Sequence, residues 1–211
     1  RRLNNQSAGN VFSNVHADNL HRFDQACRVK AIKLAAELGI PTFLNVNFMP
    51  NAVYQPERCI QTALETAGAH GFPTDRIVFE ITEGERVANV PHLQSIVTDY
   101  QQRGFQVAID DFGAGYAGLN LLAELRTDLV KLDMGLIREI HQDRTRRIIC
   151  RGIIQVCRDL EIEIIAEGIE TRDEMQCLQD LGVHLFQGYY LAKPSFESLA
   201  QVNPAVTALA G

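Results

Sequence analysis

Long hydrophobic runs, paired cysteines and an excess of positive charge are all missing from this sequence of 211 residues. No apolar run approaches the ~20 residues that a membrane-spanning helix needs, and no secretory signal opens the chain. The balance of 20 Lys and Arg against 26 Asp and Glu argues against broad electrostatic binding to DNA, RNA or an anionic membrane. The five cysteines are widely spaced without a CxxC pair, so we expect reduced thiols in a cytoplasmic protein.

Strand-like and helix-like segments alternate along the chain, of which 46% is hydrophobic. Strands are predicted at 42–48, 76–82, 105–110, 128–133, 161–166 and 183–188. Helices are predicted at 19–38, 55–70, 90–103, 115–125, 135–160 and 171–181, with a weak one at 196–202 and a loose tail at 203–211. This alternation predicts an α/β fold with a parallel sheet, and the absence of a linker predicts a single domain over 1–211.

The pattern leaves two parallel architectures open. Neither a GxGxxG nor a GxxxxGK[ST] phosphate loop follows a predicted strand, which weakens the case for an open nucleotide-binding sheet. A (β/α)8 barrel usually needs about 250 residues, sometimes about 200, and eight strands. Six strands can be recognised in the pattern, so a barrel requires strands that are hidden in it or lie before Arg1.

Polar residues gather where each predicted strand ends. They are Asn45, Asn47, Glu80, Glu83, Asp110, Asp111, Lys131, Asp133, Glu167, Glu170 and Gln187. One such residue could be a hydrogen-bonded polar group of the core, since an unpaired one costs free energy. Six strands with the same feature at the same end indicate an active site, because parallel α/β folds form their sites at that edge.

Several carboxylates at one point repel each other and require cations, and hard oxygen ligands suit Mg²⁺ or Mn²⁺. The adjacent Asp110 and Asp111 can serve two ions, an arrangement that suits phosphodiester hydrolysis. A protonated Lys131 would orient the attacking water or stabilise phosphate charge.

Other interpretations stay open. Lys131 could form a Schiff base as in a barrel lyase, although acidic neighbours raise rather than lower a lysine pKa. Asp133 could be a structural partner of Lys131, and Glu83 and Glu170 could be surface acids at loop or helix starts.

Five motifs in order carry a family resemblance. They are FEITE at 79–83, IDDFGAGY at 109–116, VKLD at 130–133, IAEGIET at 165–171 and QGYY at 187–190. With these motifs the chain, from about Phe23 to Pro194, resembles the EAL-domain cyclic-di-GMP phosphodiesterases. The resemblance implies a TIM-like (β/α)8 barrel with one antiparallel strand, and hydrolysis of cyclic di-GMP to linear pGpG in bacterial signalling. It also implies two Mg²⁺ or Mn²⁺ ions and a homodimer formed through helices beside the loop 111–120.

The resemblance also assigns roles to residues. It implies metal ligands at Asn47, Glu80, Asp110, Asp111 and Glu167, of which Asp110 and Glu167 join Lys131 as catalytic residues. It implies substrate-side contacts for Gln187 and Asp133. Glu83 is expected to hold the loop 111–120 in place.

Two features depart from the family. The Glu-Ala-Leu tripeptide that names it is absent, and Met49 stands where a serine is usual. The first departure is explained either by truncation, with the first barrel strand lying before Arg1, or by true loss. True loss would make the chain a catalytically inactive receptor for cyclic di-GMP or a protein partner. The polar segment 4–19 resembles EAL domains attached to blue-light sensors, which leaves open an N-terminal sensor domain in the full protein.

Overall fold

The computed structural model describes residues 8–48, 56–83, 89–115 and 118–207. The chain divides into two compact units. The first comprises Arg1–Phe79, Val87–Phe105 and Pro194–Leu199, and the second comprises Glu80–Arg86, Gln106–Lys193 and Ala200–Gly211. The boundary falls inside one strand, after Phe79, so each unit contains part of that strand.

The predicted alternation of strands and helices is confirmed. The described strands are β1 (Leu44–Asn47), β2 (Ile77–Thr82), β3 (Gln106–Phe112), β4 (Leu129–Leu132), β5 (Glu163–Ala166) and β6 (Leu185–Phe186). The longer helices are α2 (Ala17–Glu37), α3 (Pro56–His70), α4 (Val90–Gln102), α5 (Gly118–Glu124), α7 (Arg144–Asp159) and α8 (Arg172–Asp180). Short helices are α1 (Ala8–Phe12), α6 (Met134–Ile137) and α9 (Pro204–Thr207), and a 3₁₀ turn at Thr74–Arg76 precedes β2.

The first unit is built around an aromatic core. The rings of Phe48, Phe79, Tyr100 and Phe105 contact one another with centroids 4.9–6.4 Å apart. The guanidinium of Arg28, on α2, is fully buried and lies over the rings of Phe48 and Phe79. Asp24, one helical turn earlier, balances this charge at 2.6 Å. The strand β1 and the beginning of β2 lie in this unit.

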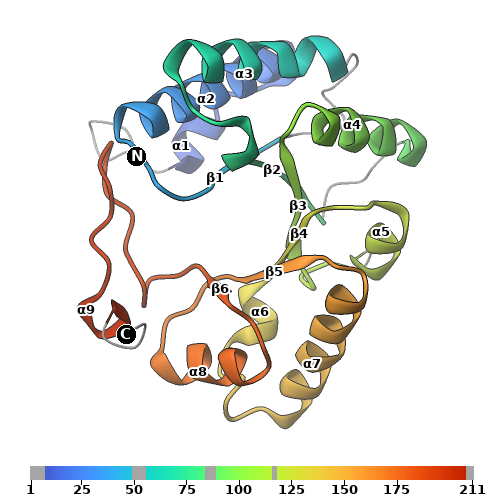
Figure 1. Cartoon of the computed structure of the whole chain (residues 1–211), viewed down its shortest axis with the longest axis vertical. Coiled ribbons are helices and arrows are strands. Elements are labelled where there is room, and N and C mark those ends of the chain that lie inside the picture. Colours follow the sequence, from blue (N-terminus) through green and yellow to red (C-terminus); the bar gives the residue numbers. More distant parts are fainter. Residues whose placement is uncertain (1–7, 49–55, 84–88, 116–117, 208–211) are drawn as a thin grey trace. The chain divides into compact units, whose positions relative to one another are not determined.

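The second unit brings the ends of successive strands to one edge. Its strand order is β2-β3-β4-β5-β6, and the pairs β3–β4, β4–β5 and β5–β6 are parallel. In Figure 1 the helices α6, α7 and α8 lie on one side of β5 and β6. Because parallel strands end at the same edge, the polar residues that follow them are gathered there.

Several local predictions are corrected. The predicted helix over 135–160 is two helices, because Asp143 accepts hydrogen bonds from the backbone N–H groups of Thr145 and Arg146 and so starts α7. The weak helix at 196–202 is wrong, since Val202 forms an antiparallel bridge with Ala192. The tail is also not loose throughout, since it contains α9.

The family features of the sheet are met in part. The six predicted strands are present, and no antiparallel strand is found within the described ranges. The closed eight-stranded barrel, with a first strand before Arg1, remains a prediction. The single domain over 1–211 also remains a prediction.

Two further features concern membrane spans and cysteines. Among the described helices, none is both long enough and apolar enough to cross a membrane. Cys27, Cys150, Cys157 and Cys177 are free thiols, as expected. Burial raises the pKa of both the Cys150 and the Cys157 thiol to about 11, so neither is an activated nucleophile.

Candidate functional site

A buried lysine stands at the centre of the polar edge of the second unit. Lys131 on β4 is 3% exposed, and its Nζ lies 2.7 Å from Glu80 Oε1, 2.7 Å from Asp110 Oδ1 and 2.9 Å from Glu167 Oε2. Each carboxylate comes from a different strand end: Glu80 from β2, Asp110 from β3 and Glu167 from the residue after β5. The structure therefore brings together four of the predicted site residues.

The electrostatics keep this lysine charged. Burial by itself would lower the pKa of Lys131, but the adjacent Glu80 and Asp110 carboxylates outweigh it and raise the pKa above its ordinary value. An ammonium tied to three carboxylates is a hydrogen-bond donor and not a free amine. The geometry thus disfavours the Schiff-base alternative, which needs an unprotonated nucleophile.

A break in the strand pattern places two consecutive aspartates in one cluster. Side chains of a regular strand alternate between its faces, so Asp110 and Asp111 would point apart. The β3–β4 register shifts between Ile109 and Phe112, and Asp111 has a φ of 54°. Carboxylate oxygens of Asp110, Asp111 and Glu167 consequently lie within 4.8 Å of one another. This bulge stores local strain, since a non-glycine residue rarely takes a positive φ.

The cluster holds more negative charge than Lys131 can balance. Burial, with Asp110 nearby, raises the pKa of the Asp111 carboxyl above its ordinary value. Burial also raises the pKa of the Glu167 carboxyl to about 7, against the opposing effect of Lys131. Crowded carboxylate oxygens are the donors that Mg²⁺ and Mn²⁺ prefer, and a divalent ion would relieve their repulsion. The donor set therefore fits the predicted metal.

The remaining predicted ligand is Asn47. It ends β1 in the first unit, where its side chain is exposed. It is not among the residues that the second unit gathers, and its role as a metal ligand stays a prediction.

The two predicted substrate-side residues lie near the same strand ends. Asp133 accepts a hydrogen bond from the Gly135 N–H at 2.7 Å and so starts α6, while the carboxylates that contact Lys131 belong to other residues. Its negative charge also acts on Asp111. Gln187 follows β6 with an exposed side chain, and its backbone bonds to Ala166 and Ile169. Both side chains are thus accessible enough to meet a ligand, and their roles remain predictions.

Glu83 anchors the glycine-rich segment after β3. Its carboxylate is buried and accepts hydrogen bonds from the backbone N–H groups of Gly113 at 2.6 Å, Gly115 at 3.4 Å and Gly118 at 2.7 Å. Gly113 has a φ of 97°, and a Cβ there would stand 2.2 Å from Leu136 Cδ1. A side chain at this position would collide with α6. Glu83 is therefore not a surface acid, and residues 116–117 of the segment lie outside the described ranges.

Sequence reasoning missed Glu174. This residue is 1% exposed, and its carboxylate accepts hydrogen bonds from the backbone N–H groups of Glu139, Glu170 and Thr171. Glu170, the alternative surface acid, pairs with Arg138 at 2.8 Å and has a half-exposed side chain. The spacing Thr171-x-x-Glu174 before a helix is a capping-box signal that could have identified Glu174.

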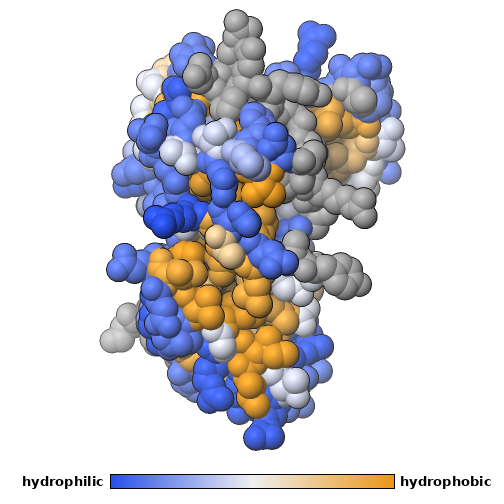
Figure 2. Space-filling view, turned by 90° about the vertical axis from the view of Figure 1, so that its right-hand side faces the viewer, coloured by the Kyte–Doolittle hydropathy of each residue, from blue (hydrophilic) through white to orange (hydrophobic). Residues whose placement is uncertain are grey.

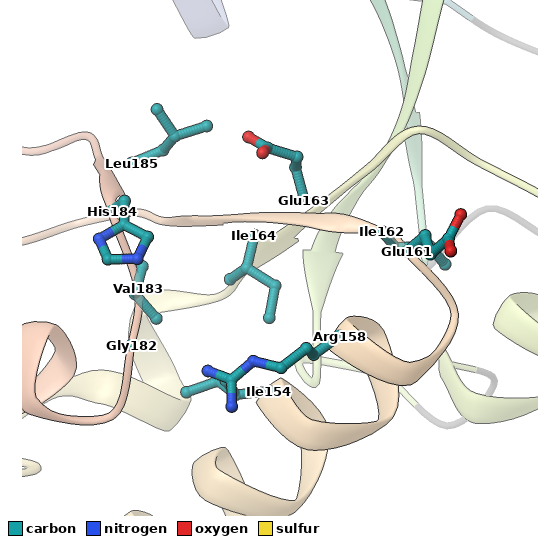
Figure 3. Close-up of a pocket in the computed structure, with 10 residues that line it drawn as sticks. All are labelled: Ile154, Arg158, Glu161, Ile162, Glu163, Ile164, Gly182, Val183, His184 and Leu185. Carbon is teal, nitrogen blue, oxygen red and sulfur yellow. The ribbon is translucent and has the colours of Figure 1, made fainter.

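A hollow of about 320 Å³ lies at the opposite ends of β5 and β6 (Figure 3). In that view Arg158 and Ile154 of α7 lie below Ile164, His184 stands to its left, and Glu163 stands above it. None of the predicted site residues lines it. The acidic cluster, not this hollow, is therefore the candidate site.

Replacing Lys131 by Met should destabilise the metal-free protein by about 3–5 kcal/mol, because buried carboxylates lose their counter-charge. Without the ammonium, the pKa values of these carboxyls rise in the folded state above their unfolded values. The loss should therefore be largest at high pH and shrink as the pH falls. Urea unfolding with EDTA at pH 5 and pH 8 measures it. The exposed Lys193→Met is the control, with an expected change within about 0.5 kcal/mol. Equal effects of the two substitutions would contradict the prediction.

Glu167→Gln should change how stability depends on pH. Glu167 has a folded pKa of about 7 against an ordinary 4.5, so its contribution is fully present below pH 4.5 and is lost as the pH rises through about 7. Metal-free Glu167→Gln should consequently gain stability relative to the unchanged chain between pH 5 and pH 8, by urea unfolding. Glu163→Gln, an exposed position on the same strand, should show a flat difference. A flat difference for Glu167→Gln would refute the raised pKa.

Comparison with known proteins places this site in a family. The family model of the EAL domain matches residues 7–194 of this chain. The c-di-GMP-bound crystal structure of a standalone versatile EAL protein from Vibrio cholerae O395 superposes with a TM-score of 0.94 at 55% identity, covering 98% of this chain and 87% of that one. The manganese and cy-diGMP complex of Klebsiella pneumoniae BlrP1 at pH 6 gives a TM-score of 0.86 at 31% identity, covering 93% of this chain and 50% of that one.

Two proteins of Escherichia coli K12 are similar in sequence. The blue light- and temperature-regulated antirepressor BluF is 30% identical over 168 residues, which are 80% of this chain and 41% of BluF. The cyclic di-GMP phosphodiesterase PdeR is 36% identical over 115 residues, which are 54% of this chain and 17% of PdeR. The chain thus spans less than half the length of these relatives. With the α/β fold, the acidic strand ends and these matches in agreement, the chain belongs to the EAL domain family of cyclic di-GMP phosphodiesterases.

Proposed function

We propose that this domain hydrolyses cyclic di-GMP to linear pGpG with the help of two Mg²⁺ or Mn²⁺ ions. The observation that carries the proposal is the buried Lys131 ammonium, which contacts three carboxylates beside the crowded oxygens of Asp110, Asp111 and Glu167. Support comes from the Vibrio protein, whose structure holds c-di-GMP, and from PdeR, a cyclic di-GMP phosphodiesterase.

The acids would hold the ions. Glu80, Asp110, Asp111 and Glu167 of the second unit are the proposed ligands of the two ions. When bound, the ions supply an activated water near neutral pH and neutralise charge on the phosphate. This supply of positive charge explains how an acidic protein accepts an anionic substrate.

Lys131 would act as a fixed donor. Its ammonium is kept protonated by the neighbouring carboxylates, so it can orient the attacking water and stabilise charge on the phosphate, and it cannot serve as the base. Asp133 and Gln187 would contact the substrate from the ends of β4 and β6. Glu83 would keep the segment that begins at Asp111 in the conformation that the bulge requires.

The net reaction is the addition of one water molecule across one phosphodiester bond. A new bond forms between the water oxygen and one phosphorus, and the bond from that phosphorus to the 3′ oxygen breaks. The 3′ oxygen ends with a proton and the phosphate stays on the 5′ side, which gives pGpG.

Purified chain should convert cyclic di-GMP to pGpG with Mn²⁺ or Mg²⁺ and lose this activity in EDTA, as followed by chromatography. Glu167→Gln should lower turnover by at least 10²-fold, since it removes a proposed ligand. Glu163→Gln, at the exposed first position of β5, should retain turnover. Tight binding of cyclic di-GMP without formation of pGpG would contradict the proposed hydrolysis and support the alternative, an inactive receptor.

We also propose that two copies of the domain associate through one face of the second unit. The helix α7 leaves Ile149 and Val156 exposed, its C-cap residue Leu160 is also exposed, and α5 exposes Leu119. Figure 2 shows hydrophobic side chains gathered on the lower part of this side of the molecule, where α5 and α7 lie in Figure 1. An apolar patch of this kind marks an interaction site, and the family resemblance points to a homodimer.

Val156→Arg should shift the protein toward the monomer in light scattering coupled to gel filtration, because it places a charge in the apolar patch. Gln155→Arg, at the adjacent exposed position of α7, is the control and should leave the oligomer unchanged. The proposed interface would be contradicted if the chain without substitutions is a monomer. It would also be contradicted if both variants remain dimers.

A further inference from the structure

A single buried carboxylate joins the two loops that follow β4–α6 and β5. Glu174 Oε1 accepts a hydrogen bond from the Glu139 N–H at 3.0 Å, and Oε2 accepts bonds from Glu170 at 3.0 Å and Thr171 at 3.1 Å. Its side chain is 1% exposed, and Arg138 Nη1 lies 3.6 Å from Oε1. Each oxygen thus holds a different loop.

One of these loops carries Glu167. The Glu167 N–H bonds to Leu132 at 3.2 Å, and the Ile169 N–H bonds to Gln187 at 3.1 Å. Gly168 has a φ of 72°, and a Cβ there would stand 2.5 Å from Met134 Cβ, so the loop runs directly over the start of α6. The far end of this short loop is Glu170, three residues after Glu167, and Glu174 holds it by accepting a hydrogen bond from the Glu170 N–H.

The contacts exceed what a helix cap needs. In a capping box the side chain of the third helical residue accepts one bond, from the N-cap N–H, which here belongs to Thr171. The bonds from Glu170 and Glu139 are additional. Glu139 itself has a φ of 54°, an unfavourable conformation for a non-glycine residue, and the bond to Glu174 helps to hold it.

The charge of Glu174 suits this double contact. Burial would raise its pKa, but the three backbone N–H donors and Arg138 outweigh burial and lower the pKa below its ordinary value. An ionised carboxylate accepts on both oxygens at once. A glutamine keeps one acceptor oxygen and would turn an N–H₂ group toward a backbone N–H, so it cannot hold both loops.

We propose that Glu174 is a positioning residue for the metal site: by tying the loop 167–171 to the segment after α6, it sets where the Glu167 carboxylate stands. The inference rests on the proposed function above, in which Glu167 is a metal ligand. Groups that orient metal ligands typically contribute 10–100-fold to metal affinity or activity.

The test compares Glu174→Gln with Asp143→Ala in the 211-residue chain. Asp143 is the matched control, because its carboxylate also accepts two backbone N–H bonds at a helix start, at 2.8 and 3.1 Å, and both come from α7 and not from the loop 167–171. Mn²⁺ affinity is measured by isothermal titration calorimetry, thermal unfolding reports general stability, and kcat and KM are measured with cyclic di-GMP.

Glu174→Gln should weaken Mn²⁺ binding by about tenfold or more and lower kcat by a similar factor, with KM changing less than twofold. Asp143→Ala should leave Mn²⁺ affinity within about twofold while lowering the unfolding temperature, because the helix loses its N-cap. Equal Mn²⁺ affinity for Glu174→Gln and the unchanged chain would overturn the positioning role and leave the proposed function standing. An unchanged chain that binds no Mn²⁺ would overturn the metal site itself, and the positioning role with it.

Discussion

The candidate site depends on one buried ammonium. Lys131 contacts Glu80, Asp110 and Glu167, which stand at the ends of three different strands, and none of these side chains is more than 14% exposed. Buried charges are tolerated only when they are paired and hydrogen-bonded. The ammonium therefore lets carboxylates gather at one edge of the sheet, while the acids that remain in excess provide oxygen donors for a cation.

Backbone geometry decides which acids reach this centre. The bulge at Asp111 turns two neighbouring aspartates toward one cluster, against the normal alternation of a strand. Two further buried carboxylates serve the backbone instead of the centre. Glu83 holds the glycine-rich segment after β3, and Glu174 holds the loop after β5. Strain at the site is thus balanced by hydrogen bonds to ionised groups, which are stronger than bonds between neutral groups.

Much of the arrangement could be predicted from sequence patterns. The alternation of apolar segments located all six strands, because strands buried on both faces leave continuous apolar runs. The convergence of Glu80, Asp110, Lys131 and Glu167 followed from parallel strands ending at one edge. Helix boundaries were harder, and the interruption before α7 escaped notice because Asp143 lies in an otherwise helical pattern.

The sequence by itself determined the fold class, the polar strand ends and the family resemblance, since these depend on residue type and order. Only the tertiary structure decided that Asp110 and Asp111 share a cluster, because the register shift and the positive φ arise from pairing with β4. It also decided that Glu83 and Glu174 are buried acceptors of backbone N–H groups. The glycines that Glu83 holds, and Glu139 that Glu174 holds, lie 30–35 residues away in the chain, and no local pattern specifies contacts at that separation.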